Sequence, residues 1–324
     1  MASPLLTIAI PVFERKEYFV EALNSAINQT VPVHIIVVDN ASSHTFFRDT
    51  VESLGKSNIK YYRNETNLGM YGNWNKCVEL CATEFVMILG DDDVLHPDFA
   101  KYFHETKQKY VDLDVFYTEI ERFGNMHFGE QKKSRMPLGY ISGIDILTYA
   151  AKYGLGITTV AMVFNKNVYP KHQFLYPQWA YSQDWLFAYS AFVDKKCFGE
   201  SAQLVRYRVH NAGNAVKIGN RDTLSQSLVF KIIKENLAFK APKFVRYAEI
   251  KERYIIRNAI INGEFDLISE FSNDSNNPFG IYIKSLLCQD LLSRLALKKI
   301  PFITFVVIVY FRCIRKILFT FSVV

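Results

Sequence analysis

Three consecutive carboxylates, Asp91–Asp93, form the segment of this sequence best suited to chemistry. They follow the apolar run Phe85–Leu89 after one glycine, and Pro97 stands shortly beyond them. Adjacent carboxylates repel one another, and at least one pKa rises unless a cation is present. Mg²⁺ and Mn²⁺ prefer such oxygen ligands. The run therefore predicts a divalent metal site, and the alternative is a solvated acidic turn that caps a helix beginning near Pro97.

A fourth carboxylate, Asp39, directly follows a second apolar run, His34–Val38. In an open α/β sheet, ligands bind in the crevice beyond the carboxyl ends of the strands. A carboxylate at that edge can accept a hydrogen bond from a base N–H or a ribose hydroxyl. An Asx turn that leads the chain out of the strand is the alternative.

The elements that must position these carboxylates alternate along the first half of the chain. Short apolar runs predict five strands, at Leu5–Ile10 (ended by Pro11), His34–Val38, Ile59–Tyr62, Phe85–Leu89 and Val115–Ile120. Apolar residues at helical spacing predict helices at Glu17–Asn28, Phe46–Leu54, Gly72–Cys81 and Pro97–Lys109. This order predicts an α/β fold with a Rossmann-like, mostly parallel sheet flanked by helices.

The pattern changes after these elements. Arg122–Gly139 is polar and contains glycine, which predicts a long loop of the kind that is often functional or mobile. Strands are predicted at Thr158–Asn165 and Ala202–Val209, and a helix at Ser182–Val193. From Thr223 onward the pattern is helical.

Four short segments stand on successive strand–helix edges. They are Thr7–Phe13, Val38–Ser42, Asn67–Gly69 with Asn75, and Gly90–Asp93 with Pro97. Together, in this order and spacing, they resemble family 2 glycosyltransferases of the GT-A fold. The resemblance lies in about the first 100 residues, and the chain beyond about residue 215 is outside it. It implies transfer of a sugar from a nucleotide diphosphate donor.

The resemblance implies nucleotide contacts for several residues. Pro11 and Phe13 would line the nucleobase pocket, and Asp39 would read the uracil or the ribose. The loop from Asn67 to Gly69 would flank the nucleoside. Glu14 stands where family members usually carry Asn, and we assign it to the nucleotide site by its position.

The acidic run matches the DxD motif of the family, which implies an Mn²⁺ or Mg²⁺ cofactor. Gly90 falls where many members place the first aspartate, so Asp91 is predicted to take the ribose role. Asp92 is predicted to contact the nucleotide as well. Either Asp92 or Asp93 is predicted to bind the metal directly.

A histidine completes the predicted metal site. The segment Arg206–His210 resembles the late family segment whose histidine approaches the metal or the diphosphate. Arg206 and Arg208 alternate on the predicted strand and therefore share a face. Neutral imidazole can bind Mn²⁺. An exposed histidine at the end of a strand is the alternative for His210.

The catalytic base is predicted in the segment Tyr181–Trp185, which falls where the family places that residue. Asp184 would take the proton of the acceptor hydroxyl, and Trp185 would form a platform for a sugar ring. The alternative is structural. Ser182 can cap a helix, and a carboxylate in the first helical turn is favoured by the helix dipole.

Charge and cysteine usage indicate the environment. Residues 1–239 carry 25 Lys and Arg against 25 Asp and Glu, so the 13 against 7 of residues 240–324 supply the whole net charge of +6. This basic tail is also apolar, with an 11-residue run at Pro301–Phe311 that is shorter than the ~20 residues of a spanning helix. We expect it to lie at an anionic membrane surface rather than on nucleic acid. Five cysteines without a framework and no recognisable signal peptide favour the cytoplasm.

We therefore predict a catalytic domain at 1–215, with a nucleotide-binding half at about 1–120 and an acceptor half at about 121–215. A helical extension at 216–299 and a membrane-associating segment at 300–324 follow, holding the enzyme at the inner face of the cell membrane. The predicted reaction is inverting, metal-dependent transfer from a UDP-sugar to an acceptor hydroxyl, on a lipid-linked oligosaccharide of surface-polysaccharide assembly. The alternatives are a nucleotidyltransferase, which usually has a glycine-rich loop where this chain has Pro11–Lys16, and a non-catalytic nucleotide-sugar-binding scaffold.

Overall fold

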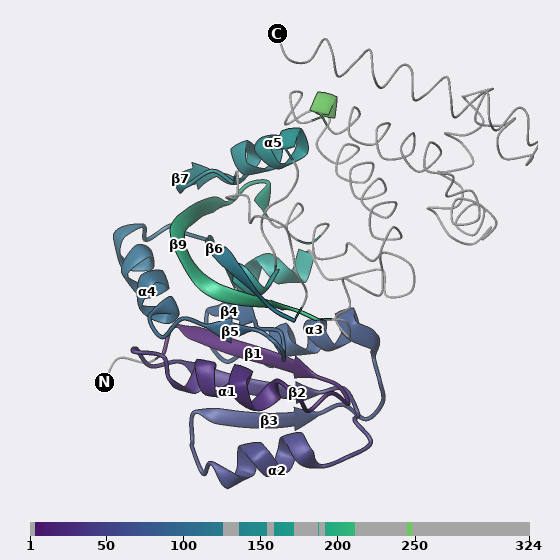
Figure 1. Cartoon of the computed structure of the whole chain (residues 1–324). Coiled ribbons are helices and arrows are strands. Elements are labelled where there is room, and N and C mark those ends of the chain that lie inside the picture. Colours follow the sequence, from purple (N-terminus) through teal and green to yellow (C-terminus); the bar gives the residue numbers. More distant parts are fainter. Residues whose placement is uncertain are drawn as a thin grey trace, which may run out of the picture. The chain divides into compact units, whose positions relative to one another are not determined.

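The computed structural model describes residues 4–125, 136–153, 159–171, 187, 192–210 and 245–247. The chain divides into two compact units, Met1–Lys217 and Ile218–Val324, and every element named below belongs to the first (Figure 1). Most of the helix expected at Ser182–Val193, nearly all of the helical pattern from Thr223 onward and the whole tail at 300–324 lie outside the described residues. The domain boundaries drawn from the sequence stay predictions.

A nine-stranded sheet forms the centre of the described unit, in the order β3-β2-β1-β4-β8-β6-β9-β5, with β7 paired to β9. Its parallel side consists of β1 (Leu6–Val12), β2 (His34–Asp39), β3 (Ile59–Arg63) and β4 (Phe85–Ile88). Its mixed side consists of β5 (Val94–Leu95), β6 (Val115–Gly124), β7 (Gly139–Ser142), β8 (Met162–Asn165) and β9 (Lys196–Val209). Here β6 and β9 are parallel, and the remaining pairs are antiparallel. The predicted α/β fold with a mostly parallel, helix-flanked sheet is confirmed.

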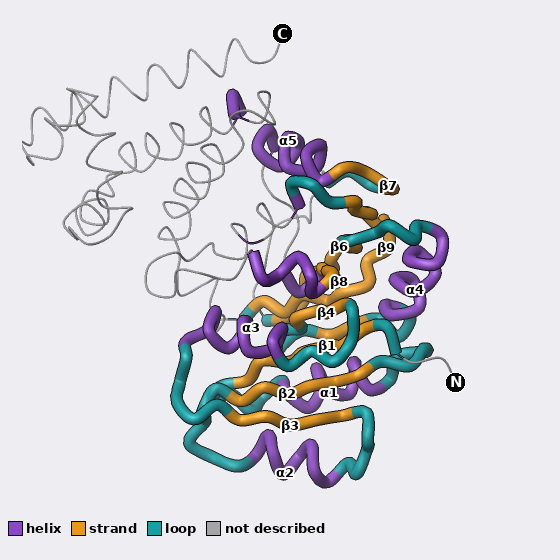
Figure 2. The backbone as a smooth tube through the Cα atoms, turned by 180° about the vertical axis from the view of Figure 1, so that it is seen from behind, coloured by secondary structure: helices purple, strands orange, loops and turns teal. Residues whose placement is uncertain are grey.

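Helices cover both faces of the parallel strands (Figures 1 and 2). One face carries α1 (Phe19–Ile27), α2 (Phe46–Ser53) and α4 (Phe99–Lys109), and the other carries α3 (Gly69–Glu79). Phe19, Phe47 and Phe103 of the first three helices are fully buried in one core with Ile8 and Val37 of the sheet. Burial on both faces explains why these strands read as continuous apolar runs. The packed sheet holds its strand ends in fixed positions.

The prediction that Pro11 ends the first strand is wrong, because β1 continues to Val12 and pairs with β2 along this length. On its other side, β1 pairs with β4 as far as Ala9. Alternate residues of a strand direct their backbone groups to the same side. Pro11 therefore points to the side on which the Ala9 carbonyl accepts a hydrogen bond from Leu89. Its missing N–H falls beyond the last β4 pairing, where a strand tolerates proline.

Several boundaries differ from the prediction on the mixed side. The loop expected at Arg122–Gly139 is shorter, because β6 runs to Gly124 and β7 begins at Gly139, while 126–135 lie outside the described residues. The strand expected at Thr158–Asn165 opens with a 3₁₀ turn at Thr159–Ala161. The last strand begins at Lys196, earlier than Ala202. β5, β7 and α5 (Gly143–Tyr153) were not predicted.

None of the helices in the described residues has the length and apolar character needed to cross a membrane.

Candidate active site

Three chain segments meet at one edge of the sheet. The turn after β1 carries Arg15, the loop after β4 carries Asp91–Asp93, and β9 ends one residue before His210. Because β1 and β4 are parallel neighbours, their carboxyl ends lie at the same edge. β9 reaches this edge through β5, where Val94 pairs with Arg206. The topology thus joins Arg15 and His210, which are 195 positions apart.

The guanidinium of Arg15 lies between two carboxylates of the acidic run. Its Nη2 is 2.7 Å from Asp92 Oδ2 and also contacts Asp91 Oδ1. Burial raises the pKa of Asp91 to about 6, although Arg15 acts in the opposite direction. Burial also disfavours the charged form of Arg15, but Asp91 and Asp92 outweigh it and raise the pKa of the guanidinium. Arg15 was not among the predicted site residues; a basic residue just past the first strand was the available signal.

His210 is in contact with the same carboxylate. Its Nε2 lies 2.9 Å from Asp92 Oδ2 and 3.2 Å from Arg15 Nη1. The ring is buried and meets the edge of Tyr18, with centroids 4.9 Å apart. A single ring nitrogen either donates to Asp92 or accepts from Arg15. The structure therefore brings together the predicted residues Asp92 and His210, with a cation beside them.

Asp93 faces the interior instead. The residue is 1% exposed, and its Oδ1 accepts a hydrogen bond from the Arg208 backbone N–H at 2.8 Å. Burial, and next the charge of Asp92, raise the pKa of Asp93 well above its usual range. Gly90 makes this arrangement possible, since an added Cβ would lie 2.6 Å from Asp93 Oδ2 and 2.9 Å from Asp92 Oδ1. A side chain at position 90 would displace both carboxylates.

Arg208 fixes the acidic loop from the other side, a role that the sequence did not reveal. Its Nε donates to the Asp92 carbonyl at 2.7 Å, and its guanidinium pairs with Glu21 of α1. The same guanidinium lies 4.4 Å from the Tyr18 ring centroid and 4.3 Å from that of Phe123. Stacking on two rings and pairing with a carboxylate leaves Arg208 little freedom to move.

Asp39 is fully buried at the end of β2. Its Oδ1 accepts from the N–H and the hydroxyl of Ser42, at 2.9 and 2.6 Å. Its Oδ2 accepts from the Tyr61 hydroxyl at 2.7 Å and from Arg63 Nη1 at 3.1 Å. Burial and the bond to Asp39 raise the pKa of Tyr61 to about 12. Asp39 thus orients Tyr61 and Arg63 in this structure, and its contact with a nucleoside stays a prediction.

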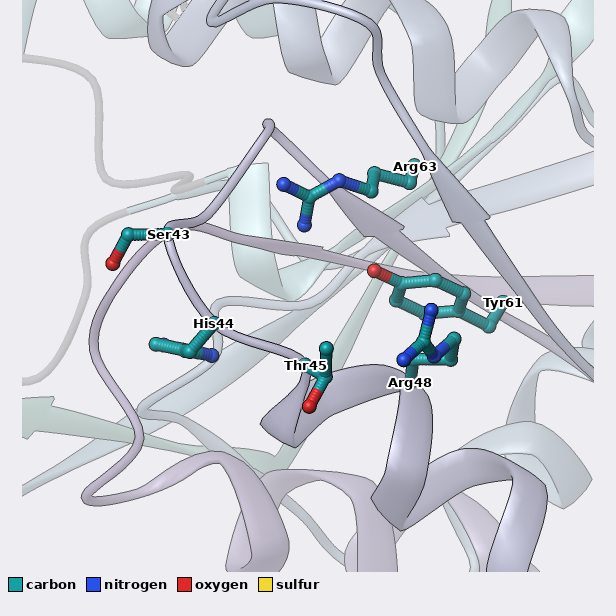
Figure 3. A pocket seen from close by; sticks show the side chains of 6 residues that line it. All are labelled: Ser43, His44, Thr45, Arg48, Tyr61 and Arg63. Atoms are coloured by element: carbon teal, nitrogen blue, oxygen red, sulfur yellow. The ribbon is translucent and has the colours of Figure 1, made fainter.

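A pocket opens beside Tyr61 and Arg63, the two side chains that Asp39 holds (Figure 3). It is lined by Ser43, His44, Thr45, Arg48, Tyr61 and Arg63. His44 Nδ1 is buried and has no hydrogen-bond partner among the described residues. Basic and hydroxyl groups therefore line a hollow next to the predicted nucleoside position, and none of them was predicted from the sequence.

The other predicted nucleotide residues surround these groups. Phe13 is 43% exposed as a residue, so its ring is accessible. Glu14 has a positive φ of 57° and directs its carboxylate to Ser43, accepting from the N–H at 2.7 Å and the hydroxyl at 2.8 Å. Hydrogen bonds from Ser43 lower the pKa of Glu14. Pro11 lies near the carboxyl end of β1 and is half-buried.

Asn67 and Gly69 belong to a network of amides at the entry to α3. Asn40 Nδ2 donates to Asn67 Oδ1 at 2.7 Å and to the Gly69 carbonyl at 3.2 Å. Gly69 has a φ of +73°, which glycine adopts without strain. The loop is consequently fixed against the residue that follows Asp39.

The predicted base Asp184 and its neighbour Trp185 lie outside the described residues. Within the described residues, no three His, Cys, Asp or Glu side chains lie together in a geometry that holds a metal ion. The donor chemistry nevertheless fits a hard divalent cation, because Asp92 and His210 supply oxygen and nitrogen ligands 2.9 Å apart. In this structure the positive charge next to these two side chains is the Arg15 guanidinium.

Comparison with solved structures defines the class of the fold. S. aureus TarS, residues 1–349, matches with a TM-score of 0.64 and 15% identity, over 82% of this chain and 79% of that chain. The same protein has been solved with UDP-GlcNAc. The mannosyltransferase PcManGT of Pyrobaculum calidifontis, solved with GDP-Man and Mn²⁺, matches with a TM-score of 0.57 and 13% identity, over 95% of this chain and 88% of that chain. The fold is that of the GT-A glycosyltransferases.

The family follows from the sequence comparison. Residues 7–159 match the model of glycosyl transferase family 2. This chain therefore carries a family 2 glycosyltransferase domain, and the resemblance stated above is confirmed. The Campylobacter jejuni GalNAc(5)-diNAcBac-PP-undecaprenol β-1,3-glucosyltransferase is 33% identical over 95 residues, covering 28% of this chain and 31% of that protein. Among the most significant curated matches, the chain spans 18% to 42% of the relative's length.

Proposed function

We propose that this protein transfers a sugar from a UDP-sugar to an acceptor hydroxyl, with inversion at the anomeric carbon and with a divalent metal ion. The observation that carries the proposal is the pairing of Asp92 with His210, at the carboxyl edge of a parallel sheet where nucleotides bind. The TarS complex with UDP-GlcNAc supports the choice of a uridine donor.

The nucleoside would lie along the ends of β1 and β2. The exposed ring of Phe13 offers a stacking surface for a base. Arg63, held by Asp39, would present N–H donors to the base or the ribose. Tyr61, whose O–H is donated to Asp39, would offer its hydroxyl oxygen as an acceptor. Asp39 would then act on the nucleoside directly, or through the two side chains that it orients.

Asp92 and His210 would hold the metal ion, and Asp91 would face the ribose. When bound, Mn²⁺ or Mg²⁺ would neutralise the charge that develops on the departing diphosphate. Arg208 keeps the Asp92 backbone in place, and Asp93 ties the loop to β9. The complex of PcManGT with Mn²⁺ supports a metal in this fold.

Asp184 would act as the general base. Inversion in one displacement needs a carboxylate that takes the proton of the acceptor hydroxyl while the hydroxyl attacks the anomeric carbon. Trp185 would contact a sugar ring. Both assignments rest on the position of these residues in the family pattern.

The acceptor would be lipid-linked. The name of the Campylobacter jejuni relative describes an undecaprenol-linked substrate, which supports this class of acceptor. The basic, apolar segment 300–324 would hold the protein at the inner membrane surface, where such acceptors are located.

Calorimetric titration of UDP with and without Mn²⁺ tests the metal site. We expect the wild type to bind UDP tightly only when Mn²⁺ is present. In Asp92→Asn, we expect Mn²⁺ to raise the affinity for UDP much less. Asp93→Asn is the comparison, because its carboxylate is buried against the Arg208 N–H. An unchanged Mn²⁺ dependence in Asp92→Asn would remove the metal-site proposal, and an equal loss in both variants would make Asp93 a second ligand.

A screen of nucleotide sugars tests the reaction itself. Transfer to a polyprenyl-diphosphate saccharide, or slow hydrolysis of one donor, identifies the sugar and the nucleotide. Turnover of a nucleoside triphosphate with a sugar phosphate, in place of a nucleotide sugar, would favour a nucleotidyltransferase.

A further inference from the structure

The acidic run contains its own counter-cation. Arg15 contacts Asp91 and Asp92 through Nη2, and its Nη1 lies 3.2 Å from His210. The side chain is 27% exposed, so the contacts are partly shielded from water. The guanidinium therefore touches the same groups that are proposed to hold the metal ion and the nucleotide.

This ion pair is incompletely satisfied as a permanent structural contact. Arg15 Nε is buried and has no hydrogen-bond partner within the described residues. Buried donors without partners cost stability, and arginines with purely structural roles usually have theirs paired. Arg208 of β9, which contacts the acidic loop from the other side, shows the contrast, since its Nε donates to the Asp92 carbonyl. Arg208 is therefore fixed by its hydrogen bond and ring contacts, whereas Arg15 is held mainly by the charges of Asp91 and Asp92.

A guanidinium and a divalent cation cannot share these ligands. Nη2 of Arg15 lies 2.7 Å from Asp92 Oδ2, the oxygen that also lies 2.9 Å from His210. A metal ion bound between Asp92 and His210 would stand in contact with a positive charge, at a partly buried position where repulsion is weakly screened. Arg15 must leave when that position is filled.

We propose that Arg15 exchanges partners during donor binding. Without ligands it neutralises Asp91 and Asp92, and with metal and donor present it releases them and pairs with the diphosphate. The inference rests on the proposed function, because it needs a metal ion and a diphosphate at this edge. Arg15 is then a positioning residue for the empty site and a donor-binding residue for the loaded one.

The diphosphate is the anion that suits the released side chain. Arg15 lies two residues beyond Phe13, on the turn that would run past the nucleoside. Guanidinium groups bind phosphate oxygens in a bidentate manner, which replaces both lost carboxylate contacts. The Tyr18 ring, with its centroid 6.0 Å from the guanidinium carbon, lies within cation–π range and offers an apolar surface along which the group can turn.

Two titrations of the full-length protein test the exchange. In the first, Mn²⁺ alone is added to the wild type and to Arg15→Met, and we expect about 10- to 100-fold tighter binding in the variant, the order of a hydrogen bond to a charged group. In the second, UDP is added at saturating Mn²⁺, and we expect Arg15→Met to bind about 10-fold or more weakly. The opposite signs are the signature, because a merely structural arginine would weaken both.

Two further variants complete the design. Lys101→Met removes a positive charge from an exposed position on α4, outside the acidic run, and should alter neither titration. Arg15→Lys keeps the charge but offers fewer donors, so it should bind Mn²⁺ alone with an affinity between those of the wild type and Arg15→Met. It decides the question if Arg15→Met does not fold.

The exchange is overturned if removing or replacing the guanidinium leaves Mn²⁺ affinity unchanged or lowers it. The diphosphate part is overturned if UDP binds equally to the wild type and Arg15→Met at saturating Mn²⁺. A different result contradicts the proposed function itself. That result is an affinity for UDP that is the same with and without Mn²⁺, in the wild type and in Lys101→Met.

Discussion

Adjacent residues on one loop can have quite separate surroundings, and the three aspartates of the acidic run do. Asp91 and Asp92 share the Arg15 guanidinium, whereas Asp93 is buried against a backbone N–H of β9. Desolvation and mutual repulsion would make three ionised carboxylates costly without these separate partners. Dividing the run between a pair that shares one guanidinium and an anchor buried against β9 lets one loop both bind a ligand and hold its own shape.

Replacing the predicted base, Asp184, should leave UDP binding intact. We expect Asp184→Asn to reduce transfer by about 10²–10⁴-fold, the usual contribution of a general base, while the affinity for UDP stays near the wild-type value. The measurement is turnover with the identified donor, together with a UDP titration. Near-normal turnover would return Asp184 to the role of a helix-start charge, and a parallel loss of UDP affinity would place it at the nucleotide.

At the scale of elements, the β4–β5 loop depends on the absence of a side chain at Gly90. We expect Gly90→Ala to cost about 1–3 kcal/mol in the free energy of unfolding, because the added Cβ would crowd Asp92 and Asp93. It should also weaken Mn²⁺-dependent UDP binding. Thermal unfolding and calorimetry measure the two effects.

Gly55→Ala is the matched control for that variant. Gly55 has a φ of +60°, so alanine there is strained, yet its Cβ would meet open space among the described residues. We expect a loss of stability of about 1–2 kcal/mol with UDP binding unchanged. Equal UDP affinity in Gly90→Ala and Gly55→Ala would show that the loop tolerates a side chain at position 90.

The parallel half of the fold could be predicted because each element there has a strong pattern of its own. β2 and β4 are buried on both faces and read as unbroken apolar runs. β5 has two residues, too few for any period, and it exists because Val94 and Leu95 pair with β9. Such short strands are decided by tertiary pairing that local sequence does not record.

The candidate site was likewise predictable only in part. The acidic run and His210 have distinctive residue types, and the structure places Asp92 and His210 in contact. Arg15 and Arg208 carry ordinary surface-type side chains, whose importance depends on contacts 76 and 116 positions away. Spacing along the chain cannot reveal such contacts, because they arise from the order of strands in the sheet.

At the scale of the whole molecule, the segment 300–324 is predicted to determine where the enzyme works. Deleting it should release the protein from membranes while UDP binding persists, because Arg312, Arg315 and Lys316 would each contribute about 1 kcal/mol at an anionic surface. Transfer to a lipid-linked acceptor should fall more than transfer to a water-soluble analogue. Cell fractionation measures the first effect, and paired assays measure the second. A truncated protein that stays in the membrane pellet would contradict this placement.

The bond between Asp93 and the Arg208 N–H spans 115 residues, and it has a consequence for how the protein is made. The loop after β4 emerges from the ribosome early, but its anchor in β9 follows only after the chain has grown through β8 and beyond. At about 5–20 residues per second, the Asp93 carboxylate waits roughly 6 to 23 seconds for that partner. Contacts of such long sequence separation form late and slowly. In a nascent chain Asp91 and Asp92 can already meet Arg15, which is made before them, but Asp93 lacks its anchor. The binding edge therefore takes its shape only after β9 has been made, and the ability to bind a donor would mark that step of folding.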